Sequence, residues 1–336
     1  MPDRRAFLRT AAAAALAPSL ARCAPRTDEE LWERGAFRKA DLSPIAVLAA
    51  DRYDLPLADT VMRGLVLCGV QAAGRRVVLK PNLVEFDPRG AINTNPAVIA
   101  ATIEAFRRMD AREVIVAEGP GHRRDNEYLL TASGLHDAMK DTGARFVDLN
   151  GDAVRRMTKL SRYSSLDELW LPATVLDADL FVSMPKLKVH HWAGVTLSMK
   201  NLFGIMPGSV YGWPKNVLHW AGIQPSILDI NATLSVPRFN ILDGIVGMEG
   251  DGPISGTAKR SGVLVFGADP VAVDATAARL MHIDPARVAY VREAGRFLGN
   301  HEAERIEQRG EDPDRLRQDY ALVPAFAHLR PGAEAA

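Results

Sequence analysis

Short apolar runs alternate with longer amphipathic stretches along most of this chain, and this alternation restricts the fold more than any other feature of the sequence. The runs at 76–80, 113–117 and 179–184 are typical of strands that are buried on both faces. Apolar residues at helical spacing follow in the stretches 96–106 and 129–142. Strands that alternate with helices build parallel sheets. We therefore predict an α/β fold, with a doubly wound, mainly parallel sheet and helices on both faces.

The same pattern continues on both sides of these segments and sets the predicted domain organisation. An α/β domain is expected over residues 27–285, which begins with a polar surface arm at 27–42, and residues 286–336 are expected to form a helical C-terminal tail. Further strands are expected at 44–49, 144–149, 239–243 and 262–266, and further helices at 59–72, 221–234 and 270–281.

The first residues of the chain have the pattern of an export signal. Arg4 and Arg5 precede a Phe-Leu pair, which is typical of the twin-arginine (Tat) pathway. The alanine-rich stretch 10–17 is too short to span a bilayer, and the small residues at 19–21 suit a signal peptidase. Residues 1–26 are therefore predicted to be a signal peptide, with the Tat translocase as a partner during export, a periplasmic or otherwise exported location and no transmembrane segment.

The residues before Cys23 also resemble a degraded lipobox, so that lipid anchoring at Cys23 is a weaker alternative. Cys23 and Cys68 are the only cysteines of the sequence, and two thiolates cannot hold a four-cysteine iron–sulfur cluster or an all-cysteine zinc site. The chain carries 41 basic and 41 acidic residues, and this balance argues against general nucleic-acid binding.

The densest group of basic residues follows the predicted strand at 179–184. Ligands of doubly wound sheets bind beyond the carboxyl ends of the strands. Apolar residues alternate with the bases here, which argues against the alternative of a solvated basic loop, and a lysine beside apolar walls can act as a base or nucleophile. We predict Lys188 and His190 as catalytic residues. We predict five residues at this sheet edge as cofactor-binding: Lys80, Asn82, Lys186, Lys200 and Asn201.

Two further histidines are candidates for the same site. His122 follows a Gly-Pro-Gly turn at the end of a strand, where an imidazole is well placed for proton transfer, although a capping histidine is the alternative. His219 lies in the segment 216–220 and is a candidate metal ligand, with an ordinary structural histidine as the alternative. The glycine-rich acidic segment 243–253 is expected to be a flexible lid that brings Asp243, Glu249 or Asp251 to the site, or else a plain turn.

Several of these segments resemble the family of the domain of unknown function 362. The resemblance covers residues 44 to about 285, and the name of the family supplies no activity. The matching pieces are 78–84, 119–121, 185–188, 200–204 and 243–250.

The chain is also similar, more distantly, to the catalytic lobe of nickel-pincer lactate racemases. Residues 118–123 match a Gly-x-His-Arg turn after an apolar strand, and His190, the Ala-Gly pair at 193–194 and Lys200 keep the spacing of the racemase motif. The resemblance implies that His122 and His190 are the acid/base pair. It also implies that Lys200 anchors a nickel-pincer nucleotide through its amine and that His219 ligates the nickel.

Three hypotheses about function follow. The first is a racemase/epimerase-like or oxidoreductase-like enzyme that acts on a small hydroxy acid or a related small anionic ligand. The second is a periplasmic ligand-binding or cofactor-handling protein without turnover. The third is a zinc or iron site made of His190, His191 and His219 with Asp243.

Overall fold

The structure, a computed structural model, describes residues 27–121 and 125–334. The predicted signal peptide with Cys23, and the candidate acid/base residue His122, lie outside the described residues. Within the described part of the chain, no helix combines the length and the apolar character that crossing a membrane requires.

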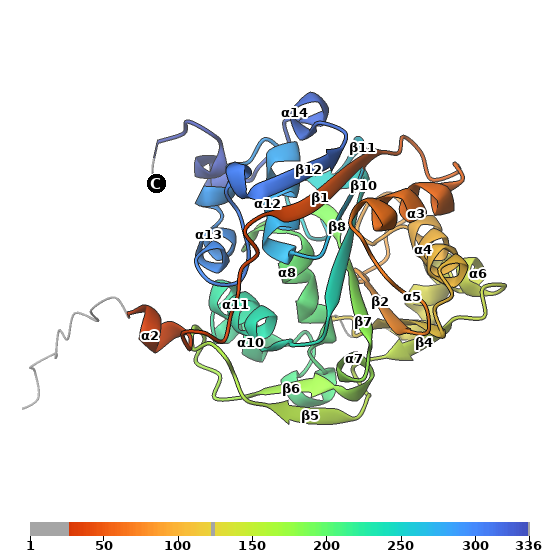
Figure 1. Cartoon of the computed structure of the whole chain (residues 1–336), viewed down its shortest axis with the longest axis horizontal. Helices are drawn as coiled ribbons and strands as arrows, with labels where there is room; N and C mark the ends of the chain where they lie inside the picture. The colour runs from red at the N-terminus through yellow and green to blue at the C-terminus, as the bar shows by residue number, and fades with distance from the viewer. Residues whose placement is uncertain (1–26, 122–124, 335–336) are drawn as a thin grey trace, which may run out of the picture.

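The core of the fold is a central sheet, which has ten strands within the described residues (Figure 1). Five neighbouring strands, in the order β10-β7-β2-β3-β4, pair in parallel. On the other side of β10, β11 is antiparallel to both of its neighbours, and β1 and β12 form a parallel pair at the edge. The prediction of a mainly parallel sheet is confirmed. The strands are β1 Ser43–Ala49, β2 Arg76–Pro81, β3 Glu113–Glu118, β4 Arg145–Asp148, β7 Leu180–Met184, β8 Lys186–His190, β9 Gly194–Thr196, β10 Arg238–Glu249, β11 Thr257–Gly267 and β12 Ile306–Gly310.

Helices cover both faces of the sheet because successive residues of each buried strand point to opposite sides. Val77 and Leu79 pack on one apolar cluster and Val78 packs on the other. The helices α3 Leu57–Leu67, α4 Pro96–Arg108 and α6 Leu135–Met139 bury their apolar residues in the first cluster. The helices α8 Ser198–Asn201, α11 Ile223–Thr233, α12 Pro270–Leu280 and α13 Ala289–Gly295 bury theirs in the second, on the opposite side in Figure 1.

Shorter elements surround this three-layered core. Strands β5 and β6 form a separate antiparallel pair, and the helices α9 and α10 follow α8 along the chain. Their bounds are α2 Asp28–Leu31, α5 Asn126–Ala132, β5 Val154–Met157, β6 Leu169–Pro172, α7 Ala173–Leu176, α9 Gly208–Tyr211, α10 Asn216–Trp220 and α14 Pro313–Leu316.

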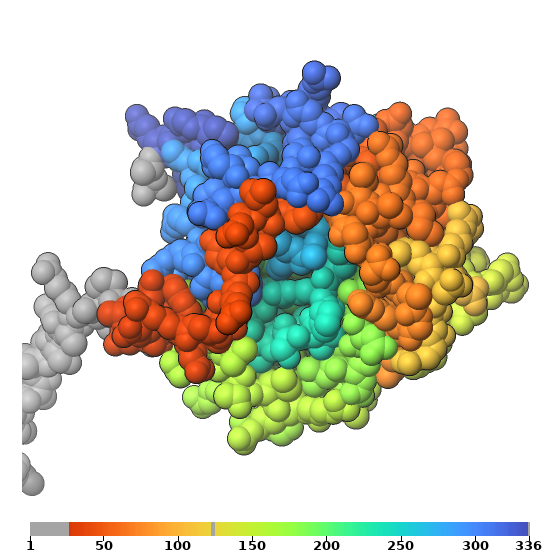
Figure 2. All heavy atoms as spheres, in the orientation of Figure 1, coloured from red at the N-terminus to blue at the C-terminus, as the bar shows by residue number. Residues whose placement is uncertain are grey.

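The predicted N-terminal arm lies on the molecular surface and connects α2 to β1. Figure 2 shows this segment, in red, between the blue C-terminal part and the middle of the chain. Trp32 stacks on Phe297 with ring centroids 4.7 Å apart, and Asn300 donates a hydrogen bond to the carbonyl of Ala40. The arm therefore connects the start of the described chain to its C-terminal third.

The structure differs from two predictions. Residues 243–249 of the glycine-rich acidic segment are not a lid, because they belong to one long strand, β10, whose partner β11 pairs with it up to Glu249. The rest of the segment lies in the loop between β10 and β11. The C-terminal tail is also not purely helical, because β12 adds a parallel edge strand beside β1. The sequence of β12 is polar since this edge strand is largely exposed, and it therefore lacks the apolar run that marks the inner strands.

Candidate active site

A cavity of about 390 Å³ lies where β2, β3 and β8 end, and is closed by α8, α10 and the loop between β10 and β11. Its apolar wall includes Leu83, Val84, Trp192, Phe203 and Ile254. Its polar lining includes Lys80, Asn82, Glu118, Lys188, His190, Thr196, Lys200, Asn201, Lys215 and His219. Of the candidate residues predicted from the sequence that the structure describes, Lys186 and the three acidic residues Asp243, Glu249 and Asp251 do not line this cavity.

Strand β8 presents its basic residues to one side because of the two-residue repeat of a strand. Leu187 and Val189 point into the apolar core, and Lys188 and His190 line the cavity. The hairpin partner β9 places Thr196 opposite Lys188. The alternation of apolar and basic residues that is visible in the sequence is thus the alternation of the two faces of one buried strand.

Lys186 occupies a different position from the one predicted. Its Nζ atom lies 2.8 Å from Asp243 Oδ2 and donates a hydrogen bond of 2.7 Å to the Tyr53 hydroxyl, and both charged side chains are buried. The Tyr53 hydroxyl donates a further bond of 3.0 Å to Asp243 Oδ1. Lys186 is therefore held in a buried ion pair and does not line the cavity, so its position does not support the cofactor-binding role predicted for it.

Lys80 and Glu118 form a buried ion pair at the base of the cavity, 2.6 Å apart, with both side chains 1% exposed. Lys80 Nζ also donates to Asn201 Oδ1 at 3.0 Å and to the carbonyl of Pro81 at 2.8 Å. These three bonds use all three protons of the ammonium group. Lys80 supplies positive charge to the cavity wall but has no donor left for a ligand.

Asn201 and Lys215 are also fully occupied by protein partners. The Asn201 amide donates to Ser183 Oγ at 3.0 Å and accepts from Lys80. Lys215 Nζ donates to the carbonyls of Gly119, Phe203 and Gly204 at 2.5, 3.1 and 3.2 Å. Burial lowers the pKa of Lys215 to about 7, against the opposing effect of Glu118. Asn201 and Lys215 therefore shape the cavity and do not offer free groups to a ligand.

Lys200 differs from these residues because, within the described part of the chain, its amine has no hydrogen-bond acceptor. The Nζ atom lies over the ring of Phe203, 3.6 Å from the ring centroid, and the residue lines the cavity. Burial, followed by the nearby charges of Lys215 and Lys80, lowers the pKa of Lys200 to about 7. Its amine is the cation that is free to contact a bound anion.

Lys188 is completely buried and has only backbone partners. Its Nζ donates to the carbonyl of Ile92 at 2.9 Å and, at the limit of hydrogen bonding, to that of Pro253 at 3.5 Å. No carboxylate among the described residues pairs with it. Burial, followed by the charges of Lys186, Lys200 and Lys80, lowers the pKa of Lys188 well below that of an ordinary lysine.

His190 and His219, which both line the cavity, are held in opposite tautomers. His190 Nδ1 accepts the backbone N–H groups of Trp192 and Ala193 at 3.0 and 3.2 Å, so the ring proton must be on Nε2. His219 Nδ1 lies 3.2 Å from the carbonyl of Lys215 and donates to it, which leaves a lone pair on Nε2. His190 can therefore donate a hydrogen bond into the cavity, and His219 can accept one.

Both imidazoles remain neutral at ordinary pH. Burial, followed by the charge of Lys200, lowers the pKa of His190 to about 2. The same two causes lower the pKa of His219 below its usual value, against a smaller opposing effect of its bond to Lys215. A neutral His219 with a free Nε2 lone pair has the protonation state that a general base needs.

Two more polar atoms of the lining have no partner in the described structure. They are Asn82 Oδ1 and Thr196 Oγ1, on side chains of residues that are 7% and 5% exposed. Buried polar atoms usually have hydrogen-bond partners, so an unpaired acceptor and an unpaired hydroxyl in one cavity are groups that a ligand can satisfy. Asn82 was predicted from the sequence; Thr196 was not.

The geometry gives little support to a metal site built by the protein alone. Within residues 27–121 and 125–334, no group of three or more His, Cys, Asp or Glu side chains could hold a metal ion. Of the four residues considered for zinc or iron, Asp243 pairs with Lys186, and His191 lies 3.0 Å from Asp251. The Nε2 lone pair of His219 is free, so His219 stays a candidate ligand for a metal ion whose other ligands belong to a bound cofactor.

Sequence reasoning missed Glu118, Lys215 and Thr196. Glu118 is the last residue of β3 and directly precedes the predicted Gly-Pro-Gly turn, so its position at the sheet edge could have been noticed. Lys215 lies in an irregular turn before α10, and Thr196 lies on a three-residue strand. No periodic pattern of the sequence marks these two positions.

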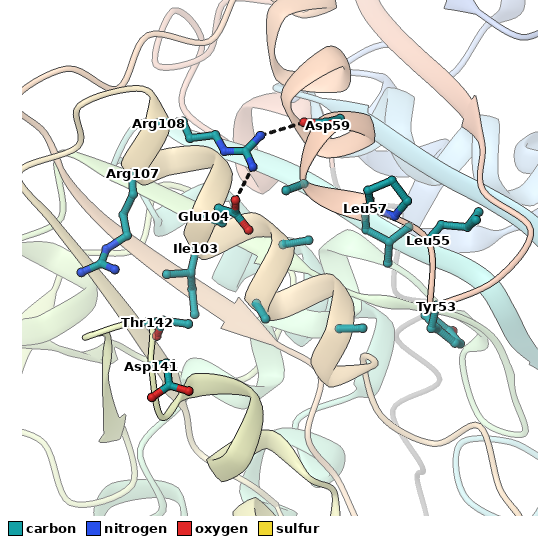
Figure 3. A pocket seen from close by; sticks show the side chains of 15 residues that line it. Tyr53, Leu55, Leu57, Asp59, Ile103, Glu104, Arg107, Arg108, Asp141 and Thr142 are labelled. Atoms are coloured by element: carbon teal, nitrogen blue, oxygen red, sulfur yellow. Dashed lines mark hydrogen bonds and ion pairs between the residues drawn. The ribbon is translucent and has the colours of Figure 1, made fainter.

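A second hollow, of about 580 Å³, lies along α4 (Figure 3). Its floor includes the small side chains of Ala97, Ala100 and Ala101, and Arg108 at one end pairs with Asp59 at 2.7 Å and with Glu104. These are ordinary surface ion pairs. The lysine-lined cavity is the candidate active site because its free groups are buried and unpaired.

Comparison with known proteins finds one family whose sequence model matches this chain. The profile of the domain of unknown function DUF362 matches residues 77–279. The thylakoid-associated protein sll1697 of Synechocystis is 29% identical over 230 residues, which cover 64% of this chain and 65% of that protein, so the match spans a little less than two thirds of the relative.

Two solved structures are similar to parts of the chain. A Thermotoga maritima protein has a TM-score of 0.44 with 14% identity, over 66% of this chain and 57% of its own. The lactate racemase apoprotein of Thermoanaerobacterium thermosaccharolyticum has a TM-score of 0.36 with 14% identity, over 65% of this chain and 54% of its own.

The substitution Glu118→Gln tests whether the buried ion pair supports the fold. Removal of one partner leaves the Lys80 charge uncompensated, and we expect a loss of about 3–5 kcal/mol in the free energy of unfolding. The matched control on the same strand is Glu113→Gln, because Glu113 is 40% exposed and pairs with Arg76 and Arg145 near the surface. Its expected effect is about 0–1 kcal/mol. Urea unfolding of both variants makes the comparison, and equal losses would contradict the interpretation.

Proposed function

Because this chain belongs to the DUF362 family, whose description names no activity, we propose its function from the cavity: an enzyme that binds a small hydroxylated anion and accepts the proton of its hydroxyl group. One observation carries this proposal. The Lys200 amine and the His219 Nε2 atom line the same buried cavity, and neither has a protein hydrogen-bond partner among the described residues. A cation and a neutral base that face one small space suit an anion with an ionisable hydroxyl group.

The charge balance of the lining supports an anionic ligand. Lys80, Lys188, Lys200 and Lys215 contribute amines to the cavity wall, and Glu118 is the one carboxylate among the described lining residues. Glu118 is neutralised by Lys80. The wall therefore keeps a positive potential, which concentrates anions in a buried site with little screening.

Each free group of the cavity then has a distinct task. Lys200 binds the anionic group, and Asn82 and Thr196 hold the hydroxyl-bearing end of the ligand through the atoms that lack protein partners. His219 accepts the hydroxyl proton at Nε2, and its Nδ1–H bond to the Lys215 carbonyl stabilises the resulting imidazolium. His190 donates from Nε2 to an oxygen of the ligand.

A nickel-pincer nucleotide is the cofactor implied by the resemblance to lactate racemases. The residues fit the two contacts implied for it, because the Lys200 amine and the His219 Nε2 lone pair are both unpartnered among the described residues. In a protein that carries the cofactor, these two groups would hold it instead of binding the anion and accepting the proton. Such a cofactor would supply a hydride acceptor for the alcohol carbon when bound. Mass spectrometry together with elemental analysis of protein from its native host would detect both a Lys200 adduct and nickel.

The substitution His219→Gln separates catalysis from binding. We expect turnover of small 2-hydroxy acids, followed as inversion or as exchange of the C2 hydrogen in D2O, to fall about 10²–10⁴-fold because the base is lost. Binding of the same acids, measured by calorimetry, should change little. His136→Gln on the exposed face of α6 is the matched control and should keep full turnover. Binding without turnover in the unmodified protein would favour the alternative of a ligand-binding or cofactor-handling protein.

The pH dependence of anion binding follows from the lysines. Lys200 and Lys215 each have a pKa of about 7, far below that of a free lysine. A bound anion favours their charged forms, so binding takes up protons above pH 7, and affinity should fall as the pH rises, by up to about tenfold per unit for each proton. Calorimetry with oxalate, which stays fully ionised, in buffers of different ionisation enthalpy measures this uptake. An affinity that is constant between pH 6 and 9 would contradict it.

Export by the Tat pathway is a second part of the proposal and rests on the sequence of residues 1–26. The double substitution Arg4→Lys and Arg5→Lys keeps the charge of this segment but removes the arginine pair, and we expect the chain to be retained in the cytoplasm. Arg9→Lys is the matched control and should leave export unchanged. Fractionation of cells that express each variant makes the measurement; export of the double variant would refute the assignment.

A further inference from the structure

More than half of the lysines of this chain are buried, although lysine is much rarer in it than arginine. Nine of its 41 basic residues are lysines, which leaves 41 − 9 = 32 arginines. Five of the nine lysines are buried, with exposed fractions of 8% or less: Lys80, Lys186, Lys188, Lys200 and Lys215. Arginine supplies positive charge at any accessible pH, whereas the amine of a buried lysine can lose its proton. The concentration of lysines inside the molecule therefore points to the chemistry of an amine as well as to charge.

The hydrogen bonds of these five amines separate Lys188 from the others. Lys80 and Lys186 have carboxylate partners, and Lys215 has three carbonyl acceptors, one for each proton of an ammonium group, so the bonding of these amines matches the protonated form. Lys188 has two carbonyl partners, which is the number of protons on a neutral amine. Its third position, the lone pair, has no partner among the described residues.

Burial and the neighbouring charges also favour the neutral form of the Lys188 amine. The side chain is 0% exposed and lies near three other buried lysines, and a fourth buried charge without a carboxylate is costly. Its two carbonyl partners come from different loops, Ile92 from the loop after β2 and Pro253 from the loop after β10. These loops fix the orientation of the amine toward the cavity that it lines.

We propose that Lys188 is a nucleophile that forms an imine with a small aldehyde or ketone that carries an anionic group. The inference rests on the proposed function in one respect, since the anionic group is bound by Lys200 in the same cavity. Nothing else in the proposal requires His219 to act as a base.

The step balances without any other reactant. The Nζ lone pair of Lys188 adds to the carbonyl carbon, a C–N bond forms, and the π electrons of the carbonyl move to its oxygen. The oxygen then leaves as water with the two protons that the amine carried, and a C=N bond remains.

Two neighbours are placed to assist this step. His190 lies two residues further along the same face of β8, and its Nε2–H can donate to the developing oxygen. Thr196 is the cross-strand partner of Lys188, and its hydroxyl has no partner in the described structure, so it can hold the departing water. The unpaired hydroxyl beside the amine is an observation independent of the amine's own bonding.

Reductive trapping in the unmodified protein tests the proposal. Pyruvate and cyanoborohydride are added, and the reduced adduct is mapped by peptide mass spectrometry over all nine lysines. We expect Lys188 to be labelled at least about tenfold faster than Lys140, an exposed lysine that follows α6, and oxalate to slow the labelling of Lys188 alone. Absence of an adduct at Lys188, labelling at the same rate as Lys140, or labelling at Lys200 in its place would overturn the proposal.

A second measurement separates this inference from the proposed function. The variant Lys188→Met should lose the adduct at this position, whereas labelling of the exposed Lys140 in the same variant should be unchanged. Oxalate binding by the unmodified protein without labelling would refute the imine and leave the anion site intact. Failure of the unmodified protein to bind oxalate would refute the anion site itself. The mapping in the unmodified protein does not depend on the folding of the variant.

Discussion

The buried ion pair between Lys80 and Glu118 is the interaction on which the arrangement of the site depends. It joins the ends of β2 and β3, and Asn201 of α8 completes it. Glu118 also accepts the backbone N–H of Leu83 at 3.1 Å, which fixes the chain where it leaves β2. A pair this deeply buried gains little net stability, because desolvation offsets the attraction. Its effect is to fix the relative positions of β2, β3 and α8, because these three segments must meet at one point for both charges to be satisfied.

That pair also determines the electrostatics of the cavity. Glu118 is the one carboxylate in the described lining, and Lys80 consumes it, so Lys188, Lys200 and Lys215 face the same space without a counter-charge. Burial is the main cause that lowers their pKa values, and the charges of neighbouring lysines lower them further. The amines of Lys200 and Lys215, with a pKa of about 7, thus exchange protons near neutral pH. A bound anion supplies the missing negative charge, and this links ligand binding to protonation.

The sequence predicted the edge of the sheet and most of the polar residues that line the cavity, because strand ends in a parallel sheet converge on one side whatever the details of packing. It could not predict which of those residues are free. Lys80, Lys186 and Lys200 look alike in the sequence, and only their three-dimensional partners distinguish them: a glutamate, an aspartate and an aromatic ring. Residues 243–249 of the expected lid form a strand instead, because β11 pairs with β10 through Gly244 and Gly247.

The two histidines show how much this distinction matters for mechanism. The resemblance to racemases implies an acid/base role for His190, and the sequence gives no reason to treat its ring differently from that of His219. Two backbone N–H groups occupy the Nδ1 lone pair of His190, so its ring can donate but has no free lone pair with which to accept a proton. His219 has the opposite arrangement, with Nδ1–H bonded to a carbonyl and Nε2 free. In the proposed reaction, His219 and not His190 therefore accepts the proton of the ligand, because the backbone groups around the two rings fix opposite tautomers.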